Sequence, residues 1–184
     1  MDKIKVILIP GNGGSPQDNW FPYLERELSK LGIKVINKQF PDPALARQEF
    51  WLPFIKELGA DENTVLIGHS SGAIASLRFA EKNKILGTIL VGAYSTDLGD
   101  ETEKKSGYFS YPWDWQSIKN NQKWIVQFAS TDDPFIPIEE PRIINQNLNT
   151  DYHEYTDQKH FGHGFSPKRE FPELIEFLKQ KVFD

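Results

Sequence analysis

The chain has 184 residues, of which 39% are hydrophobic and 26% charged, and its net charge is −5. This length suits one domain with a substantial buried core and is short for two, so we expect a single domain over residues 1–184. The acidic balance, without any dense basic cluster, argues against a nucleic-acid partner. The sequence contains no cysteine, which excludes disulfides, thiolate metal sites and cysteine nucleophiles.

The N-terminal segment carries only a short apolar run. Residues 1–10, MDKIKVILIP, lack the long apolar stretch and the small-residue cleavage site of a secretory signal. No segment approaches the roughly 18 apolar residues that a membrane-spanning helix needs. We therefore expect a cytoplasmic protein that does not associate with membranes.

Short β-branched runs alternate along the chain with amphipathic stretches of helical length. This alternation is typical of a compact α/β fold, a mostly parallel sheet with helices on both faces. We expect strands over residues 3–9, 34–37, 64–67, 85–91, 123–128 and 152–155, and helices over 20–31, 44–58, 73–82 and 171–181. Residues 93–116, rich in Gly, Ser and aromatic residues, are expected to form an irregular loop, and loops this long are usually functional or mobile.

A serine lies at the centre of a turn framed by glycines. Residues 68–72, Gly-His-Ser-Ser-Gly, fit the pattern G-x-S-x-G with Ser70 in the middle. A buried strand is predicted directly before this turn and a small-residue helix directly after it, which is the setting of a nucleophile elbow. The helix N-terminus favours negative charge developing near the Ser70 hydroxyl. The alternatives are a turn that only joins strand to helix, and Ser71 as a weaker nucleophile candidate.

The acid of a serine-hydrolase triad is expected after a late strand. Residues 129–137, ASTDDPFIP, follow the fifth predicted strand. A carboxylate there can hold an imidazole in one tautomer and stabilise the imidazolium. We predict Asp133 in this role, with Asp132 as the alternative. Both residues also fit an ordinary turn before a proline.

Two of the four histidines follow the last predicted strand, where the general base is expected. His160 and His163 lie between that strand and the last helix. His69 adjoins Ser70 on a sharp turn, where neighbouring side chains diverge, and His153 lies inside the strand. We favour His160 as the base, with His163 as its competitor. Either could be a solvated loop histidine, and no carboxylate pattern supports a metal site at the pair.

The loop after the first predicted strand offers backbone amides to an oxyanion. Residues 10–14, Pro-Gly-Asn-Gly-Gly, make a turn in which the Asn12 amide is the candidate donor, and the Ser71 amide is the second. A phosphate-cradling loop is the alternative. The chain lacks both the G-K-[ST] ending and the G-x-G-x-x-G spacing that such loops require, so we reject it.

Together these residues resemble the family of retinoblastoma-binding protein nine, which are small serine hydrolases. The matching stretches run nearly end to end: PGNGG (10–14), PDP (41–43), WLPF (51–54), GHSSGA (68–73), AY-x-x-DLGDE (93–101), SGYF-x-x-PW-x-W (106–115), VQF-x-STDDPF (126–135) and YTD-x-x-HF (155–161). The resemblance implies an α/β-hydrolase fold without a large lid domain and a triad of Ser70, Asp133 and His160. It also favours His160 over His163, because YTD-x-x-H fits the family pattern.

The chain departs from this family in two places. The name-giving member binds retinoblastoma protein through an L-x-C-x-E segment, and residues 58–62 here read Leu-Gly-Ala-Asp-Glu. Ala60 replaces the required cysteine, so retinoblastoma-type binding is not expected. The loop after His160, FGHGFSPKRE, is longer than in the family, which predicts a different rim around the site.

These observations predict a cofactor-free serine hydrolase that cleaves a small carboxylic ester or amide through an acyl-enzyme. Phe109 and Trp113, in the aromatic stretch 106–115, are candidates for the wall of the acyl pocket, and they fit ordinary core positions equally well. The alternative function is a non-catalytic interaction module on a hydrolase scaffold, because a fold does not fix a function.

Overall fold

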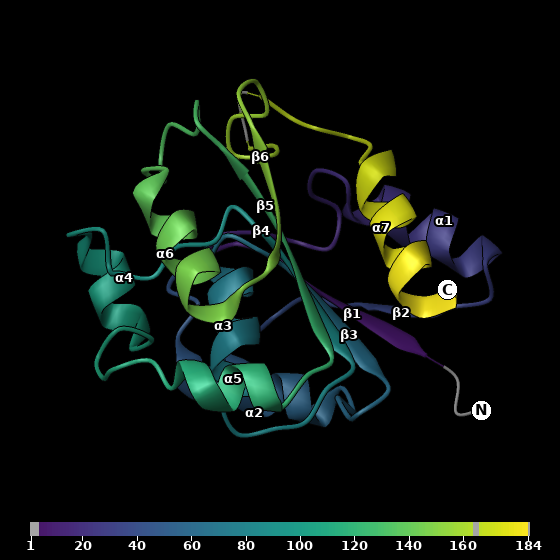
Figure 1. The fold of residues 1–184 in the computed structure, drawn as a ribbon, viewed down its shortest axis with the longest axis horizontal. Coiled ribbons are helices and arrows are strands. Elements are labelled where there is room, and N and C mark those ends of the chain that lie inside the picture. Colours follow the sequence, from purple (N-terminus) through teal and green to yellow (C-terminus); the bar gives the residue numbers. More distant parts are fainter. Residues whose placement is uncertain (1–3, 164–165, 184) are drawn as a thin grey trace.

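The computed structural model describes residues 4–163 and 166–183, and its centre is one parallel sheet (Figure 1). The six strands are β1 (Lys5–Ile9), β2 (Lys34–Asn37), β3 (Thr64–His69), β4 (Gly87–Val91), β5 (Trp124–Ser130) and β6 (Asp151–Tyr155). The helices are α1 (Phe21–Lys30), α2 (Gln48–Glu57), α3 (Ser71–Ala80), α4 (Glu101–Ser106), α5 (Trp115–Asn120), α6 (Glu139–Leu148) and α7 (Pro172–Phe183). The predicted α/β architecture, with about six parallel strands, is confirmed.

Helices cover both faces of the sheet, because alternate strand residues are apolar on both sides. Val6 and Leu8 of β1 pack toward α1 and α7, whereas Ile7 and Ile9 pack toward α2, α3, α5 and α6. Figure 1 shows the same division, with α1 and α7 on one side of the sheet. Burying both faces of central strands is characteristic of parallel sheets.

The strand order β2-β1-β3-β4-β5-β6 places a reversal between β1 and β3. The chain runs outward from β1 to β2 and then returns to the other side of β1, so the loops after β1 and β3 diverge. In open parallel sheets this reversal creates a crevice at the carboxyl ends of the strands. The Asn12 loop and the Ser70 turn both lie at this edge.

The helix predictions were wrong in two respects. The helix predicted from residue 44 begins at Gln48, because Asp42 and Ala46 have φ of 48° and 50° and interrupt the helical pattern. Three helices, α4, α5 and α6, were not predicted. The first two have six residues each, fewer than two helical turns, so a hydrophobic period cannot repeat in them, although Asp100 and Asp114 cap them through their side chains.

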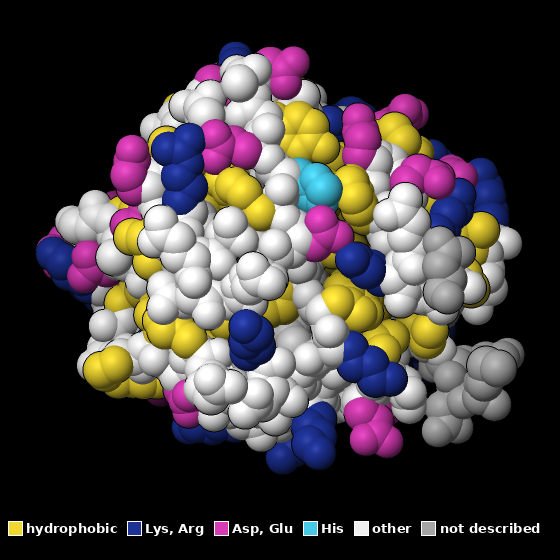
Figure 2. Space-filling model, in the orientation of Figure 1, with side chains coloured by type: hydrophobic (Ala, Val, Ile, Leu, Met, Phe, Trp, Pro, Cys, Tyr) yellow, Lys and Arg dark blue, Asp and Glu magenta, His cyan; other side chains and the backbone are white. Residues whose placement is uncertain are grey.

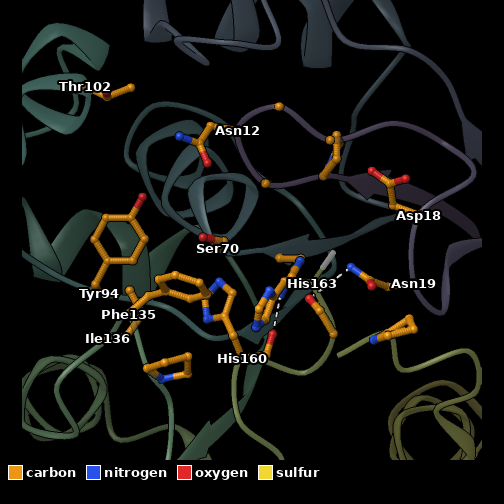
Figure 3. Close-up of a pocket in the computed structure, with 18 of the residues that line it drawn as sticks. Asn12, Asp18, Asn19, Ser70, Tyr94, Thr102, Phe135, Ile136, His160 and His163 are labelled. Carbon is orange, nitrogen blue, oxygen red and sulfur yellow. Dashed lines mark hydrogen bonds between the residues drawn. The ribbon is translucent and has the colours of Figure 1, made fainter. Parts of the chain in front are cut away.

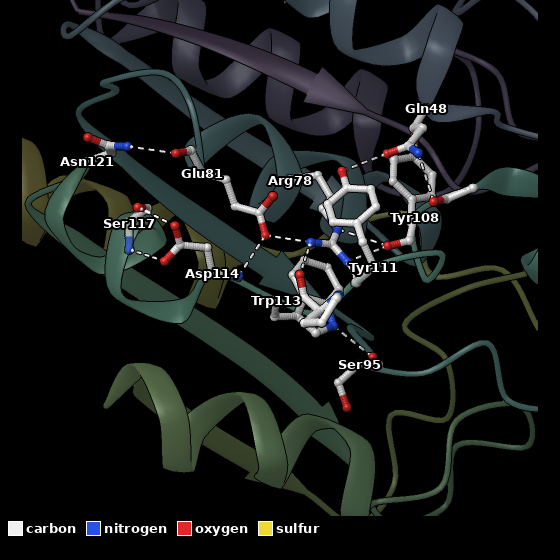
Figure 4. Close-up of polar contacts among 12 residues, drawn as sticks. Gln48, Arg78, Glu81, Ser95, Tyr108, Tyr111, Trp113, Asp114, Ser117 and Asn121 are labelled. Atoms are coloured by element: carbon white, nitrogen blue, oxygen red, sulfur yellow. Dashed lines mark hydrogen bonds and ion pairs between the residues drawn. The ribbon is translucent and has the colours of Figure 1, made fainter.

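A buried arginine holds the aromatic stretch that follows α4 (Figure 4). The Arg78 side chain, on α3, donates to the carbonyl oxygens of Tyr108, Tyr111 and Pro112 and pairs with Glu81. Its guanidinium also lies 3.7 Å from the ring centre of Trp113. The segment that lacks periodicity is therefore ordered by one side chain from the helix after Ser70.

Candidate active site

Ser70 lies on a strained turn between β3 and α3. Its φ of 54° and ψ of −122° are unusual for a residue with a side chain, and its amide donates to the Val91 carbonyl at 2.9 Å. A Cβ at Gly68 would overlap the Gly72 carbonyl, and one at Gly72 would overlap the Ile9 carbonyl. The two glycines therefore allow the close approach that presents Ser70 at the end of the sheet.

A carboxylate and an imidazole are hydrogen bonded beside this turn. His160 Nδ1 lies 2.7 Å from Asp133 Oδ2, and the two side chains are 7% and 4% exposed. The other carboxylate oxygen of Asp133 accepts the amides of Phe135 and Ile136 at 2.9 and 3.1 Å. Since a carboxylate only accepts, Nδ1 donates in this hydrogen bond, and in the neutral form of the ring Nε2 is the nitrogen that can accept a proton.

The two alternative residues occupy different positions. Asp132 Oδ1 accepts the Ser130 hydroxyl at 2.6 Å and the Lys159 amide at 2.8 Å, and these bonds, the hydroxyl first, lower the pKa of Asp132. The His163 ring packs on Phe135 with 5.0 Å between ring centres, and no carboxylate of the described chain lies within ion-pair distance of it. The structure therefore pairs Asp133 with His160 and leaves both alternatives outside the pair.

Ser70, His160 and His163 line one cavity of about 830 Å³ (Figure 3). From Ser70 the cavity extends in one direction toward Tyr94 and Thr102, and in the other toward Asp18 and Asn19. Figure 2 shows a histidine at the surface beside hydrophobic side chains, on a face where acidic and basic side chains are interspersed. The cavity is bounded by polar and apolar groups, and His163 in its lining is partly exposed to solvent.

Among the described residues, the Ser70 hydroxyl has no hydrogen-bond partner, so the contact to His160 Nε2 is not formed. In hydrolases without substrate such contacts are often long and tighten on binding. The backbone amides of Asn12 and Ser71 likewise donate to no acceptor in the described part of the chain. The Asn12 loop lies against the nucleophile turn, since a Cβ at Gly11 would sit 3.2 Å from Ser70 Cβ.

The predicted pocket residues Phe109 and Trp113 do not line this cavity. The Trp113 indole donates to the Ser95 carbonyl at 2.8 Å and its ring covers Arg78, so it is part of the arginine cluster. Phe109 packs behind Tyr94 with 5.6 Å between ring centres. Both instead line a separate cavity of about 220 Å³.

The apolar wall of the main cavity consists of residues that sequence reasoning did not select. Tyr94 and Leu98 follow β4, and Phe135 and Ile136 follow β5. Their position directly after the carboxyl ends of central strands was the available signal, since sites in such sheets form there. The aromatic stretch 106–115 contributes none of the residues that line this cavity.

A series of buried hydrogen bonds that links two hydroxyl groups to a carboxyl group borders the cavity. Tyr94 donates to Glu103 at 2.7 Å, so the Ser71 hydroxyl donates to Tyr94 across 3.1 Å. Burial raises the pKa of Glu103, and burial followed by the nearby Glu103 charge raises that of Tyr94. This series of hydrogen bonds fixes the first residue of α3 against the cavity wall.

Gly92 supports the imidazole of His160. Its φ is 60°, and a Cβ there would lie 3.0 Å from His160 Cε1, which is closer than side chains normally approach. The glycine therefore provides room for the ring as well as a left-handed backbone. Its place directly after β4 was the only sequence signal.

His69 is buried, and its ring contacts that of His160, with 4.8 Å between the ring centres. Its Nε2 lies 2.8 Å from the carbonyl of His160. Burial, with the nearby His160 as a smaller cause, lowers the pKa of His69 to about 3. The ring is therefore neutral, and Nε2–H donates to the carbonyl.

This shift predicts a pH dependence of stability. Between about pH 6.5 and pH 3 an unfolded histidine binds a proton that native His69 does not, so the free energy of unfolding falls as pH falls. His69→Gln removes this contribution. Urea unfolding measures the free energy of unfolding of both proteins between pH 7 and pH 5. Below pH 6.5, this free energy should fall less steeply with falling pH in the variant, by about 1.4 kcal/mol per pH unit. Equal slopes would contradict the assignment.

Within residues 4–163 and 166–183, no group of three or more His, Asp or Glu side chains is arranged to hold a metal ion. In the same residues no helix is long and apolar enough to cross a membrane. From the long loop after His160, His163 and Arg169 line the cavity, while Gly164 and Phe165 lie outside the described residues.

A parallel sheet with a strained serine turn after its third strand defines an α/β hydrolase. Residues 6–179 match the serine hydrolase family. The chain is 45% identical to serine hydrolase RBBP9 of Rattus norvegicus over 182 residues, which cover 97% of this chain and 95% of the relative. The chain therefore belongs to this family of serine hydrolases, and it is an enzyme.

Solved structures agree with the fold. The crystal structure of the ydeN gene product from B. subtilis superposes with a TM-score of 0.87 at 26% identity, covering 99% of this chain and 100% of the other. A crystal structure from a study of carboxylesterases of the Thaumarchaeon Nitrososphaera gargenis superposes with a TM-score of 0.75 at 14% identity. The match covers 100% of this chain and 92% of the other. At that identity the likeness shows the fold alone. The described residues of this chain form no large lid domain.

Proposed function

We propose that this protein hydrolyses small carboxylic esters or amides through an acyl-enzyme formed on Ser70. The observation that carries the proposal is the His160–Asp133 hydrogen bond of 2.7 Å, in the cavity that Ser70 also lines. The free lone pair of His160 Nε2 faces the side of the ring away from Asp133, where it can accept the Ser70 proton.

In the proposed reaction, Ser70 Oγ attacks the substrate carbonyl while His160 Nε2 takes the hydroxyl proton. Asp133 keeps the imidazole in the productive tautomer and stabilises the imidazolium. The amides of Asn12 and Ser71 donate to the oxyanion, and the N-terminus of α3 adds a favourable field. His160 then protonates the leaving group, and a water molecule releases the acyl group by the reverse sequence of proton transfers.

The cavity supports a small substrate. Its volume of about 830 Å³ is within the range of small-molecule sites, and one domain over residues 1–184 suffices to build it. Incubation of the wild-type protein with a fluorophosphonate probe and with a series of p-nitrophenyl esters tests the proposal. Covalent labelling and ester turnover with a pre-steady-state burst support it. The absence of both would contradict it.

The cavity walls predict which aromatic residue sets acyl preference. Phe135 is 53% exposed at the cavity, so Phe135→Ala should change the chain-length profile of ester hydrolysis with a small effect on stability. Trp113→Ala should instead destabilise the fold by about 2–4 kcal/mol, somewhat below the value for a fully buried ring, and leave the profile unchanged. Thermal melting and an acyl-length series on both variants provide the comparison. The opposite pattern would place Trp113 in the substrate pocket.

A further inference from the structure

The loop that carries His160 has little regular structure of its own. It follows β6, and three of its residues have left-handed backbone: Lys159 with φ of 50°, Phe161 with 54° and Gly162 with 105°. Such conformations persist only when the surrounding structure determines them. The position of the His160 ring therefore depends on what the loop contacts.

Three consecutive carbonyl groups of this loop accept hydrogen bonds from side chains elsewhere in the fold. His69 Nε2 donates to His160 O at 2.8 Å, Trp20 Nε1 to Phe161 O at 2.9 Å, and Asn19 Nδ2 to Gly162 O at 3.1 Å. We call Asn19, Trp20 and His69 the carbonyl clamp. Its members come from the residues before α1 and from the end of β3.

The clamp is rigid because its members support one another. The Trp20 and His69 rings meet edge to face with 5.8 Å between their centres, and Trp20 also packs on Phe171 at 5.7 Å. Trp20 and Phe161 are fully buried. Water therefore cannot replace the indole N–H at the Phe161 carbonyl, and losing the donor leaves that carbonyl unpaired.

The clamp also joins the two reacting side chains. His69 directly precedes Ser70, so one imidazole connects the backbone of the nucleophile turn to the backbone of His160. A displacement of about 1 Å between reacting groups can reduce turnover by about a hundredfold. Asp133 and Gly92 contact the His160 ring itself, whereas the clamp holds the backbone of its loop.

We propose that Asn19, Trp20 and His69 are positioning residues that hold His160 at the distance from Ser70 that proton transfer requires. The inference rests on the proposed role of His160 as the base. The donor atoms of the three side chains bind backbone carbonyls, so the proposal gives these atoms no contact with substrate. Their effect is on kcat and on the His160–Asp133 hydrogen bond.

Trp20→Phe tests the clamp with a matched control. The variant keeps a buried aromatic ring but loses the indole N–H together with part of the packing of the larger indole ring. Trp51 is also fully buried and donates its indole N–H to a backbone carbonyl, that of Pro41, at 2.7 Å, on the opposite face of the sheet. Trp51→Phe therefore imposes a similar loss of packing and of one hydrogen bond without touching the loop of His160.

We expect kcat of Trp20→Phe to fall about tenfold to a hundredfold with little change in KM, measured well below its melting temperature. In Trp51→Phe kcat should stay near the wild-type value, even where melting is lowered equally. The low-field proton resonance of His160 Nδ1–H should shift or broaden in Trp20→Phe alone. Equal kcat in the two variants would overturn the inference.

His69 provides a second test that does not depend on Trp20. His69→Gln keeps an N–H at a similar reach, whereas His69→Phe keeps a ring and loses the donor. We expect His69→Gln to retain most of the wild-type kcat and His69→Phe to lose about tenfold or more. His160→Ala is assayed in parallel. An active His160→Ala would contradict the proposed function, whereas an inactive His160→Ala beside a fully active His69→Phe would contradict the clamp alone.

Discussion

Ser70→Ala is expected to abolish fluorophosphonate labelling and to lower kcat for ester hydrolysis by about three orders of magnitude or more. The reason is that the proposed acyl-enzyme forms on the Ser70 hydroxyl, and Ser70 is the one serine among the described residues that line the cavity. Labelling followed on a gel and turnover of a p-nitrophenyl ester measure the loss directly.

Ser110→Ala is the matched control, because Ser110 is an exposed loop serine that does not line the cavity. This control should label like the wild type. Circular dichroism and thermal melting establish that Ser70→Ala remains folded. If Ser71→Ala removed labelling while Ser70→Ala kept it, the nucleophile would be Ser71 and the assignment would be wrong.

His160→Ala is expected to lower kcat by about three orders of magnitude or more, a loss comparable to that of Ser70→Ala. The physical reason is its hydrogen bond to buried Asp133, which leaves Nε2 as the acceptor for the serine proton. His163→Ala should cost far less, because the His163 ring packs on Phe135 and has no carboxylate partner among the described residues.

Steady-state rates of His160→Ala and His163→Ala decide which histidine is the general base. Asp133→Asn adds a third comparison. Asparagine keeps the size of the aspartate side chain and removes its charge, so Asp133→Asn should also lose activity strongly. Asp132→Asn should act mainly through the loop that Asp132 holds. A larger loss in His163→Ala than in His160→Ala would move the base to His163.

Much of the fold followed from the sequence because its strongest signals were local. Five β-branched runs and the weaker run at residues 152–155, Tyr-His-Glu-Tyr, marked the strands, and the alternation with amphipathic stretches implied parallel connections. The shortest helices were missed, since six residues make fewer than two helical turns and a hydrophobic period cannot repeat in them. The start of α2 was misplaced because positive φ at Asp42 and Ala46 depends on tertiary contacts rather than on residue type.

The candidate site likewise contains residues that local sequence patterns indicate and residues whose roles depend on tertiary contacts. Ser70 and the Asn12 turn were visible in local glycine patterns, and the chain order of the triad narrowed the acid and the base to two aspartates and two histidines. The choice of Asp133 over Asp132 depends on how two adjacent carboxylates are directed, which the structure displays and spacing does not. The carbonyl clamp joins residues about 91 to 143 positions apart, so no local pattern could reveal it.

The same distinction applies to the wall of the cavity. Aromatic content selected Phe109 and Trp113, but a buried arginine 35 residues before Trp113 holds that segment away from the cavity. A charged side chain on a helix is ordinarily expected at the surface, so Arg78 gave no sign of a buried role. Its three carbonyl partners explain why burial is tolerated.

Peptide mapping by mass spectrometry after fluorophosphonate labelling tests the central claim most directly. The wild-type protein is labelled, digested and sequenced by fragmentation to locate the phosphonyl group. The account predicts a single modified residue, Ser70, in the peptide that spans the end of β3 and the start of α3. A phosphonyl group on any other residue, or an unmodified Ser70 in an active enzyme, would contradict it.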